Sequence, residues 1–462
     1  MKVKKILALT LCVAMTAGLM ACGGKNESVQ QPSDNGAEES SSGGAAEAQE
    51  ESAEKNMDNE EGITISLSSW GLTDSAAKAA FEGWEAMDTG IAIDNEVLDY
   101  DEYLQNLKIK LASGGGPDVF TLQPGALLTE FEEYLVDVTD MAKESWGDDW
   151  ESQFIPTYLD MIKKADGSYP GLPVGSGSGA SLLYTDLDTL AKYGIEKAPR
   201  TYDELKAACD TIRAKGGVTA VSMVEQDWAA IDLFMNIAGD INQEKMYAAI
   251  EGEADWTDPE MVQAFDLYQK CFTEGILVDG QLGGVDCTLY FAQERTSPFM
   301  IEGSWMNANI ELNESYSEAF AAGAVYDTCT IDWNNDGKPA PLTNTVDAVI
   351  CINKNSENID AAWQFAKYMA IDGCEAIINT TMLYYPTTAN FEIKKDNFLP
   401  QSVEIFEICS EKLSDGTAGY REIPYPDLKQ EITDQIQLLG LGETTPEDAA
   451  AAVQAASEAQ KR

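Results

Sequence analysis

Between residues 62 and 460, short segments with strand patterning alternate with segments of helical patterning, and this alternation constrains the fold more than any other feature. Ile63–Trp70 alternates apolar and polar residues as a strand does, and Ser75–Ala86 carries apolar residues at helical spacing. A second strand and a second helix are predicted at Ile91–Val97 and Tyr103–Ala112. Alternating elements at this spacing indicate α/β domains with parallel or mostly parallel sheets and helices on both faces.

The same alternation continues toward the end of the chain, with capping residues that predict where helices begin. Thr201 and Glu204 have the spacing of a capping box, and Thr257 precedes Pro259 in a predicted first turn. Strands are predicted at 118–122, 182–184, 218–224 and 347–352, and helices at 188–193, 201–215, 231–238, 257–274 and 359–369, before a last helix that Thr445 caps. About 400 residues with this pattern are too many for one ordinary domain, so two domains are expected.

The first residues have the pattern of a secretion signal. Three lysines precede an apolar run, Ile6–Met20, with small residues near its end. That run is short for a membrane-spanning helix, which needs about 20 apolar residues. We therefore expect a signal peptide over residues 1–21, with an uncleaved membrane anchor as the alternative.

Cys22 follows Leu19–Ala21, and this sequence resembles the bacterial lipobox, whose Cys is acylated on sulfur and becomes the new N-terminus. A diacylglyceryl Cys carries two acyl chains, and stable anchoring takes about two such signals. Residues 24 to 61 contain no aromatic side chain and almost no aliphatic one, so they cannot bury a core. Residues 22–61 are therefore expected to be a lipidated Cys followed by a disordered acidic tether.

Charge and missing residue types exclude several classes of function. The chain has 30 Lys and Arg against 79 Asp and Glu, so it would repel nucleic acid and anionic headgroups. It has no His, which removes the Ser-His-Asp and Cys-His mechanisms and the commonest metal ligand. Of nine Cys, Cys12 lies in the signal peptide and Cys22 in the lipobox, and the others are scattered without disulfide or zinc spacing. We expect no nucleic-acid partner, no metal and no cofactor.

Several short motifs follow one another in a characteristic order. They are Asn106–Val119 with its Gly-Gly-Gly-Pro-Asp, Tyr169–Pro173, Leu183-Tyr184, Tyr193–Ile195, Pro199–Leu205, Phe291–Trp305 and Ala361–Lys367. Together they resemble the extracellular solute-binding proteins of the maltose-binding, sugar-importer type. The resemblance spans about residues 62 to 460.

This resemblance implies a two-lobe fold like that of periplasmic binding proteins, with interleaved lobes and a central ligand cleft. The first lobe would take residues 62–172 and 340–372, and the second 173–339 and 373–462. It also implies a monomeric, non-enzymatic protein, lipid-anchored on the outer face of a bacterial membrane. Such a protein would capture a carbohydrate ligand and deliver it to the transmembrane subunits of an ABC permease.

Aromatic and polar residues near strand ends predict the ligand site, because sugar rings stack on aromatic faces while polar groups take their hydroxyls. Trp70 ends the first strand, where ligands of open parallel sheets bind. Trp305 corresponds to the family's stacking aromatic, and the small residues Gly303 and Ser304 before it would leave backbone room beside a ligand. The predicted ligand-binding residues are Trp70, Gln123, Trp228, Ser304, Trp305, Tyr384 and Tyr425.

Three further motifs have structural interpretations. Gly175–Gly179 lacks the Lys-Ser/Thr of a phosphate-binding loop and is expected to be a flexible crossing or cleft-lining loop. Asp332–Gly337 begins like a calcium loop, but Thr343 stands where the bidentate acid belongs, so a turn is expected. Asp118 could bind ligand, although holding the start of its strand is the better interpretation.

Two other functions remain open at this point. A surface-anchored glycoside hydrolase is the main alternative, because the sequence contains many acids and does not show their separations. A passive cell-wall or adhesion lipoprotein is a third possibility, but it gives no reason for the late return of the chain to the first lobe.

Replacing Cys22 with Ser is expected to abolish membrane attachment and to leave the folded part intact, because no other segment of the mature chain is predicted to hold it in a bilayer. Fractionation of cells that express either protein measures the effect. Cys12→Ser, in the signal peptide, is the matched control and should still partition with the membrane. Equal partition of the Cys22 variant and its parent would contradict the lipobox interpretation.

Overall fold

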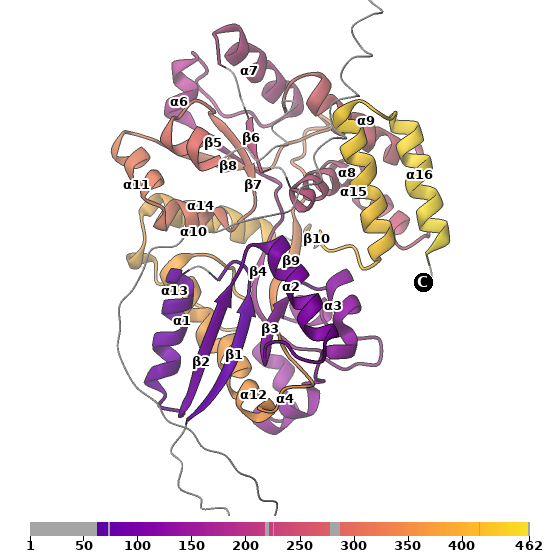
Figure 1. The fold of residues 1–462 in the computed structure, drawn as a ribbon. Helices are drawn as coiled ribbons and strands as arrows, with labels where there is room; N and C mark the ends of the chain where they lie inside the picture. The colour runs from indigo at the N-terminus through magenta and orange to yellow at the C-terminus, as the bar shows by residue number, and fades with distance from the viewer. Residues whose placement is uncertain are drawn as a thin grey trace, which may run out of the picture. The chain divides into compact units, whose positions relative to one another are not determined.

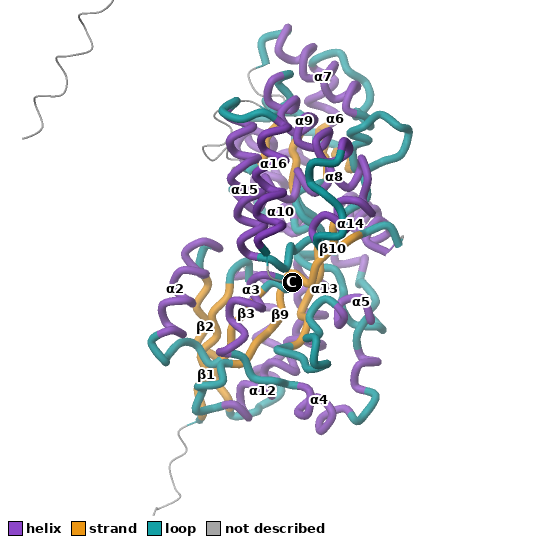
Figure 2. The backbone as a smooth tube through the Cα atoms, turned by 90° about the vertical axis from the view of Figure 1, so that its right-hand side faces the viewer, coloured by secondary structure: helices purple, strands orange, loops and turns teal. Residues whose placement is uncertain are grey.

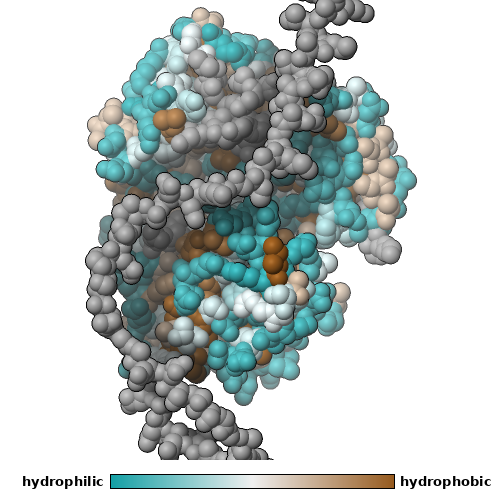
Figure 3. All heavy atoms as spheres, viewed as in Figure 1, coloured by the Kyte–Doolittle hydropathy of each residue, from teal (hydrophilic) through white to brown (hydrophobic). Residues whose placement is uncertain are grey.

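The computed structural model describes residues 62–72, 74–217, 221–224, 226–277, 287–414 and 416–460. The predicted signal peptide, the lipidated Cys22 and the tether lie outside the described residues. Glu61–Arg462 forms one compact unit. Among the described residues, no helix combines the length and the apolar character that crossing a bilayer requires. On the face shown in Figure 3, hydrophilic residues cover most of the described surface and hydrophobic residues form smaller patches.

The first sheet has six strands in the order β10-β9-β3-β1-β2, with β4 also paired with β9 (Figure 1). Its strands are β1 (Ile63–Ser69), β2 (Ile91–Val97), β3 (Val119–Leu122), β4 (Leu172–Gly177), β9 (Thr343–Ile352) and β10 (Gly419–Tyr420). β1 is parallel to β2 and β3, whereas β9 is antiparallel to β3 and β4 and parallel to β10. Residues far apart in the sequence thus lie side by side in one sheet.

The second sheet has four strands in the order β6-β7-β5-β8. They are β5 (Leu182–Asp186), β6 (Val221–Met223), β7 (Phe299–Glu302) and β8 (Tyr326–Cys329). β6 and β7 are parallel, but β5 is antiparallel to both β7 and β8. The expectation of a mostly parallel sheet is wrong here, because apolar patterning identifies a strand but does not show the direction in which the chain returns to the sheet.

Helices surround both sheets (Figure 2). With the first sheet lie α1 (Asp74–Ala86), α2 (Tyr100–Ala112), α3 (Ala126–Phe131), α4 (Thr139–Trp146), α5 (Pro156–Asp160), α12 (Ile359–Tyr368) and α13 (Cys374–Thr381). With the second lie α6 (Leu187–Lys192), α7 (Tyr202–Ala214), α8 (Asp227–Ile250), α9 (Pro259–Thr273), α10 (Met306–Leu312), α11 (Glu314–Ala321), α14 (Pro400–Ser414), α15 (Pro426–Leu441) and α16 (Pro446–Ala459). α8, α9, α15 and α16 pack together (Figure 2).

The helix starts follow the predicted caps at two of three places. The Thr201 hydroxyl accepts a hydrogen bond from the Glu204 backbone N–H at 3.3 Å, and Thr445 caps α16 in the same way. The predicted cap Thr257 is wrong, because Asp258 occupies the N-cap position of α9. α8 is much longer than predicted and breaks at Asn242, whose side-chain oxygen accepts from the Lys245 N–H at 3.0 Å and restarts the helix.

Two hydrophobic cores hold the unit together, and β5 contributes to both. Leu182 and Tyr184 belong to the core that is shared with the first sheet, whereas Leu183 belongs to the core beneath α7, α8, α9, α15 and α16. This division follows from the alternation of side chains along a strand. β5 is therefore buried on both faces and anchors the second sheet between the two cores.

The chain passes between the two sheets several times. Ser178–Ser181 joins β4 to β5, residues 330–342 join β8 to β9, and residues 382–399 join α13 to α14. The predicted flexible loop at Gly175–Gly179 is wrong in part, since Gly175–Gly177 is buried strand paired with β9. Gly175 is required there because a Cβ would lie 2.6 Å from the Tyr384 Cβ. The lobe boundaries given by residue number stay a prediction.

Gly179→Ala is expected to destabilise the protein by about 1–3 kcal/mol, because its Cβ would lie 2.5 Å from the Asp232 Oδ1 and overpack the crossing. Gly239→Ala is the matched control: it lies on α8, where a Cβ would make ordinary contacts of 3.7 and 3.8 Å with Pro341 and Met246. That variant should be neutral, or stabilised by up to about 1 kcal/mol. Urea unfolding of the three proteins measures both, and equal stability of the two variants would contradict the predicted overlap.

Candidate functional site

A cavity of about 280 Å³ lies where the two sheets approach each other. Trp70 and Gln123 follow the carboxyl ends of β1 and β3, and Trp305 follows the end of β7. The lining residues are Trp70, Gly71, Tyr100, Gln123, Asp347, Leu383, Tyr384, Arg421, Gln226, Trp228, Trp305, Ala308 and Asn309. The carboxyl ends of strands are where open α/β sheets bind ligands, so the position of this pocket fits a binding site.

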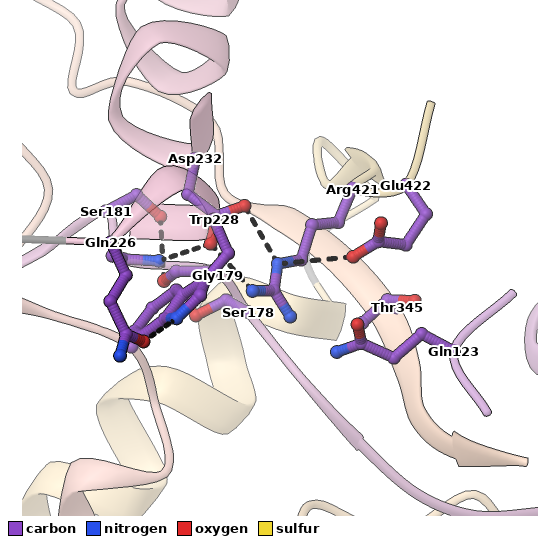
Figure 4. Close-up of polar contacts among 12 residues, drawn as sticks. Gln123, Ser178, Gly179, Ser181, Gln226, Trp228, Asp232, Thr345, Arg421 and Glu422 are labelled. Carbon is purple, nitrogen blue, oxygen red and sulfur yellow. Dashed lines mark hydrogen bonds and ion pairs between the residues drawn. The ribbon is translucent and has the colours of Figure 1, made fainter. Parts of the chain in front are cut away.

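Two tryptophans form the wall on the side of the second sheet. The rings of Trp228 and Trp305 meet edge to face, with centroids 5.5 Å apart and planes at 69°. The indole of Trp305 lies over the backbone of Gly303, where a Cβ would come within 2.5 Å of Cε3. The room at Gly303 therefore accommodates Trp305 itself, which corrects the expectation that it is left for a ligand. The indole N–H of Trp228 donates to the side-chain oxygen of Gln226 (Figure 4).

The opposite wall is built around Trp70. Its ring meets Tyr100 edge to face at 5.4 Å and Tyr103 at 5.3 Å. Tyr100 donates to the side-chain oxygen of Gln123 at 2.8 Å, and Tyr103 donates to the Thr121 carbonyl at 2.5 Å. Trp70 is partly exposed, as Trp228 and Trp305 are. All three therefore keep part of their ring surface accessible to a ligand.

A buried ion pair lies between the two walls. Arg421 binds Asp232 with two hydrogen bonds, Nε to Oδ1 at 2.8 Å and Nη2 to Oδ2 at 2.7 Å (Figure 4). Its guanidinium lies 5.4 Å from the ring centroid of Trp305, within the range of a cation–π contact. Asp347 and Glu422 lie 3.6 and 3.7 Å from the same guanidinium. The Arg421 side chain therefore contacts both the carboxylates and the aromatic wall of the pocket.

The segment around Arg421 is fixed by contacts with the first sheet and with the end of α8. The Arg421 N–H donates to the Asn344 carbonyl at 2.9 Å, which continues the pairing of β10 with β9. On the α8 side, Glu251 accepts hydrogen bonds from Tyr425 at 2.6 Å and from Tyr420 at 3.3 Å. These contacts hold the short segment between β10 and α15, so the guanidinium has a defined position.

Five of the predicted ligand residues line the pocket: Trp70, Gln123, Trp228, Trp305 and Tyr384. Ser304 and Tyr425 are not among the lining residues. Ser304 is buried, and its hydroxyl accepts from the Ser178 N–H at 3.0 Å, so it fastens the first crossing. Tyr425 binds Glu251 and supports the segment that carries Arg421.

Eight lining residues were not predicted from the sequence, and Tyr100, Asp347 and Arg421 are the three of them that matter most to the argument. Tyr100 follows the carboxyl end of β2, and the rule that pointed to Trp70 would have found it. Asp347 lies in the predicted strand 347–352, where its side-chain direction was unknown. Arg421 follows a strand of two residues and carries no local signal in the sequence.

Burial changes the acidity of two carboxyl groups near the pocket. It raises the pKa of Glu302 to about 7, with Asp232 adding to the effect, while the Gly303 N–H and Arg421 oppose it. Burial also raises the pKa of Asp347, although Arg421 and the amide of Gln123 favour its charged form. Glu302 is buried at the end of β7, and its Oε1 accepts the Gly303 N–H at 3.0 Å.

The two other acidic motifs have structural contacts. The Asp118 carboxylate accepts hydrogen bonds from the Ser66 N–H at 2.8 Å and from the Ser356 hydroxyl at 2.5 Å. It therefore links β1 to the segment that follows β9. Asp332 accepts the Asp336 and Gly337 N–H groups at 3.0 and 2.8 Å and closes its turn. In the part of the chain that the structure describes, no three His, Cys, Asp or Glu side chains are grouped to hold a metal ion.

Two α/β lobes, joined by repeated crossings around a shared pocket, define the two-lobe fold of solute-binding proteins. Residues 69–275 match the model of the family of bacterial extracellular solute-binding proteins. The resemblance inferred from the sequence motifs is thereby confirmed, as is the α/β fold.

The structure is similar to several solved structures whose sequences are 18–20% identical to this chain. One, from work on xylan utilisation by Caldanaerobius polysaccharolyticus, has a TM-score of 0.72 and 20% identity over 85% of this chain and 99% of its own. A chitin oligosaccharide binding protein (TM-score 0.70) and a maltose-bound protein of T. maritima (0.69) each have 18% identity over 86% of this chain and 99% of their own. At these identities the likeness shows the fold.

A sequence relative matches a shorter stretch. A protein of Brucella abortus described as a binding protein is 29% identical over 136 residues, which is 29% of this chain and 32% of that protein. The match thus spans about a third of the relative's length.

Glu302→Gln is expected to gain stability relative to the parent as pH rises from about 5 to 8. The folded state holds the Glu302 proton up to pH about 7, whereas the unfolded state releases it near its ordinary pKa of 4.5. The parent therefore loses stability across that window, on the order of 3 kcal/mol at about 1.4 kcal/mol per pKa unit, and the neutral Gln does not. Urea unfolding of both proteins at several pH values measures the difference, and a difference independent of pH would contradict the raised pKa.

Proposed function

We propose that this protein captures a sugar or short oligosaccharide outside the cell and delivers it to the transmembrane subunits of an ABC permease. The observation that carries the proposal is the pocket itself. Partly exposed tryptophans face it from both sheets, and Gln123, Asp347 and Arg421 supply polar groups between them. Aromatic faces for the C–H surfaces of a sugar ring, with a few fixed polar groups, are what carbohydrate recognition needs.

The structural neighbours support the same ligand class. Those named above concern xylan utilisation, chitin oligosaccharide and maltose, and they share the fold over nearly their full length. A cavity of about 280 Å³ is slightly smaller than the range of about 300–1,000 Å³ for small-molecule sites. This size favours a ligand of one or two rings over a long chain.

Ligand binding would favour a closed arrangement of the two lobes. A ring held between Trp70 and the Trp228–Trp305 wall touches residues of both sheets at once. Contacts that form only when both walls are engaged give the closed state a higher affinity, and this difference shifts the population. The permease would then recognise the closed form.

The proposal extends to the place where the protein works. Acylation of Cys22 would hold a monomer on the outer face of the bacterial membrane, with residues 22–61 as a tether. A flexible chain of that length has a root-mean-square reach of about 35 Å, taking about 5–6 Å times the square root of its length. The folded part could then reach a permease beside its anchor.

A surface glycoside hydrolase is less well supported. Hydrolysis needs two carboxyl groups on either side of the scissile bond, about 5–9.5 Å apart. Among the described residues that line the pocket, Asp347 is the single carboxylate. Asp232 is not a lining residue, and its carboxylate is paired with Arg421. Incubation with an oligosaccharide mixture separates the functions: products would indicate an enzyme, whereas a raised melting temperature without turnover would indicate a binding protein.

Trp305→Ala is expected to weaken sugar binding by about 2 kcal/mol, roughly thirtyfold in the dissociation constant, because a stacking face is lost. Its cost in stability should be smaller than the roughly 3–5 kcal/mol of a fully buried Trp, since the ring is partly exposed. Calorimetric titration measures the affinity, with the sugar identified by a thermal-shift screen, and urea unfolding measures the stability.

Trp146→Ala is the matched control for this experiment. Trp146 is also partly exposed, but it packs against Phe154 and Trp363 and does not line the pocket. Its loss should leave the affinity unchanged. If Trp305→Ala instead loses stability and keeps its affinity, Trp305 is a core residue and the binding site lies elsewhere.

A further inference from the structure

Arg421 lines the pocket, and one of its three side-chain nitrogens, Nη1, is buried without a hydrogen-bond partner among the described residues. The side chain is 5% exposed and lines the cavity, and Asp232 occupies its Nε and Nη2 edge. Nη1 makes no hydrogen bond to any described residue. Its ion-pair partner, the Asp347 Oδ1, is 3.6 Å away, which is too far for a hydrogen bond. A buried donor without an acceptor is costly, so a ligand oxygen at this position would be favoured.

An arginine donor in a pocket ordinarily suits a carboxylate ligand. The charges around Arg421 argue against that ligand here. Three carboxylates, Asp232, Asp347 and Glu422, lie within 4 Å of the guanidinium, and Lys429 pairs with Glu422 at 2.8 Å. Three negative groups thus face two positive ones. A ligand carboxylate would add a further negative charge at short range in a poorly solvated place, where repulsion is strong.

A hydroxyl group fits the same position better. It can accept a hydrogen bond from Nη1 and donate one to the neighbouring Asp347, which a carboxylate cannot do because it only accepts. Asp347 receives the Gln123 amide on Oδ1 at 3.2 Å and so presents an acceptor of fixed orientation. The tryptophan rings carry no net charge, so the selection rests mainly on Arg421 and Asp347.

We propose that the pocket takes an uncharged polyhydroxyl ring, with the Nη1 of Arg421 donating to one of its oxygens, and that it rejects the corresponding acidic sugars. This inference rests on the proposed function, since it specifies which sugars the site binds. Arg421 is then a ligand-contacting residue, and Asp347 determines specificity.

The test compares neutral sugars with their acids by calorimetric titration of the full chain. The probes are D-glucose, D-galactose, D-xylose and cellobiose, beside D-glucuronate, D-galacturonate and cellobiouronate, together with any sugar that the thermal-shift screen identifies. At least one neutral sugar should bind, and its acid should bind at least about tenfold more weakly. An acid that binds as tightly as its neutral partner would overturn the inference and leave the proposed function standing. Binding of no sugar at all would overturn both.

Asp347→Asn tests the cause of the selection. Asn keeps an oxygen for the Gln123 amide and removes one negative charge, so the affinity for the acid relative to the neutral sugar should rise by about tenfold or more. Asp94→Asn is the control, because Asp94 is exposed on β2 and does not line the pocket. It removes the same charge and should leave the ratio unchanged. An unchanged ratio in Asp347→Asn would contradict the charge argument.

Arg421→Lys tests the donor itself. The ammonium keeps the positive charge but cannot bind Asp232 through two donors and also reach the ligand. Affinity for the neutral sugar should fall at least about tenfold in protein that urea unfolding shows to be folded. Unchanged affinity would remove Arg421 from the ligand contacts, and if this variant does not fold, Asp347→Asn still decides the proposal.

Discussion

The buried pair of Asp232 and Arg421 joins the parts of the chain that meet at the pocket. Asp232 belongs to α8, and its Oδ2 also accepts the Ala180 N–H of the first crossing at 3.2 Å. Arg421 follows β10, which is paired with the start of β9. Removing one partner of such a pair leaves an unpaired buried charge, which typically costs about 3–5 kcal/mol. The geometry of the pocket therefore depends on this contact.

The aromatic walls depend on the same region. Arg421 lies against Trp305, Trp305 meets Trp228, and Gly303 leaves the space in which the Trp305 ring lies. On the other side, Tyr100 links Trp70 to Gln123, and Gln123 donates to Asp347. A continuous set of contacts thus runs from one wall to the other through polar groups. A ligand that touches both walls would add contacts on both sides of these polar groups. Such an arrangement fits a binding function better than a catalytic one.

Much of the architecture could be predicted from the sequence because it depends on local pattern. Ile91–Val97 is a strand with the predicted bounds. Trp70 and Trp228 were predicted from their place at the end of a predicted strand or after one, and Trp305 from the family resemblance. The features that the sequence did not predict depend on contacts between residues that are far apart in the chain. The antiparallel direction of β5 follows from the crossings, and Ser304 and Tyr425 are occupied by partners that the sequence does not reveal. Arg421 reaches the pocket through pairing with a strand about 75 residues earlier, and no local pattern marks it.

The central claim is that a sugar binds between the two walls beside Arg421, and a crystal structure of the protein with its bound sugar tests this most directly. A sugar ring should stack between Trp70 and the Trp228–Trp305 wall, with one hydroxyl within about 3.2 Å of both the Arg421 Nη1 and the Asp347 carboxylate. A sugar bound elsewhere, or one in this pocket without contact to the tryptophans and Arg421, would contradict it.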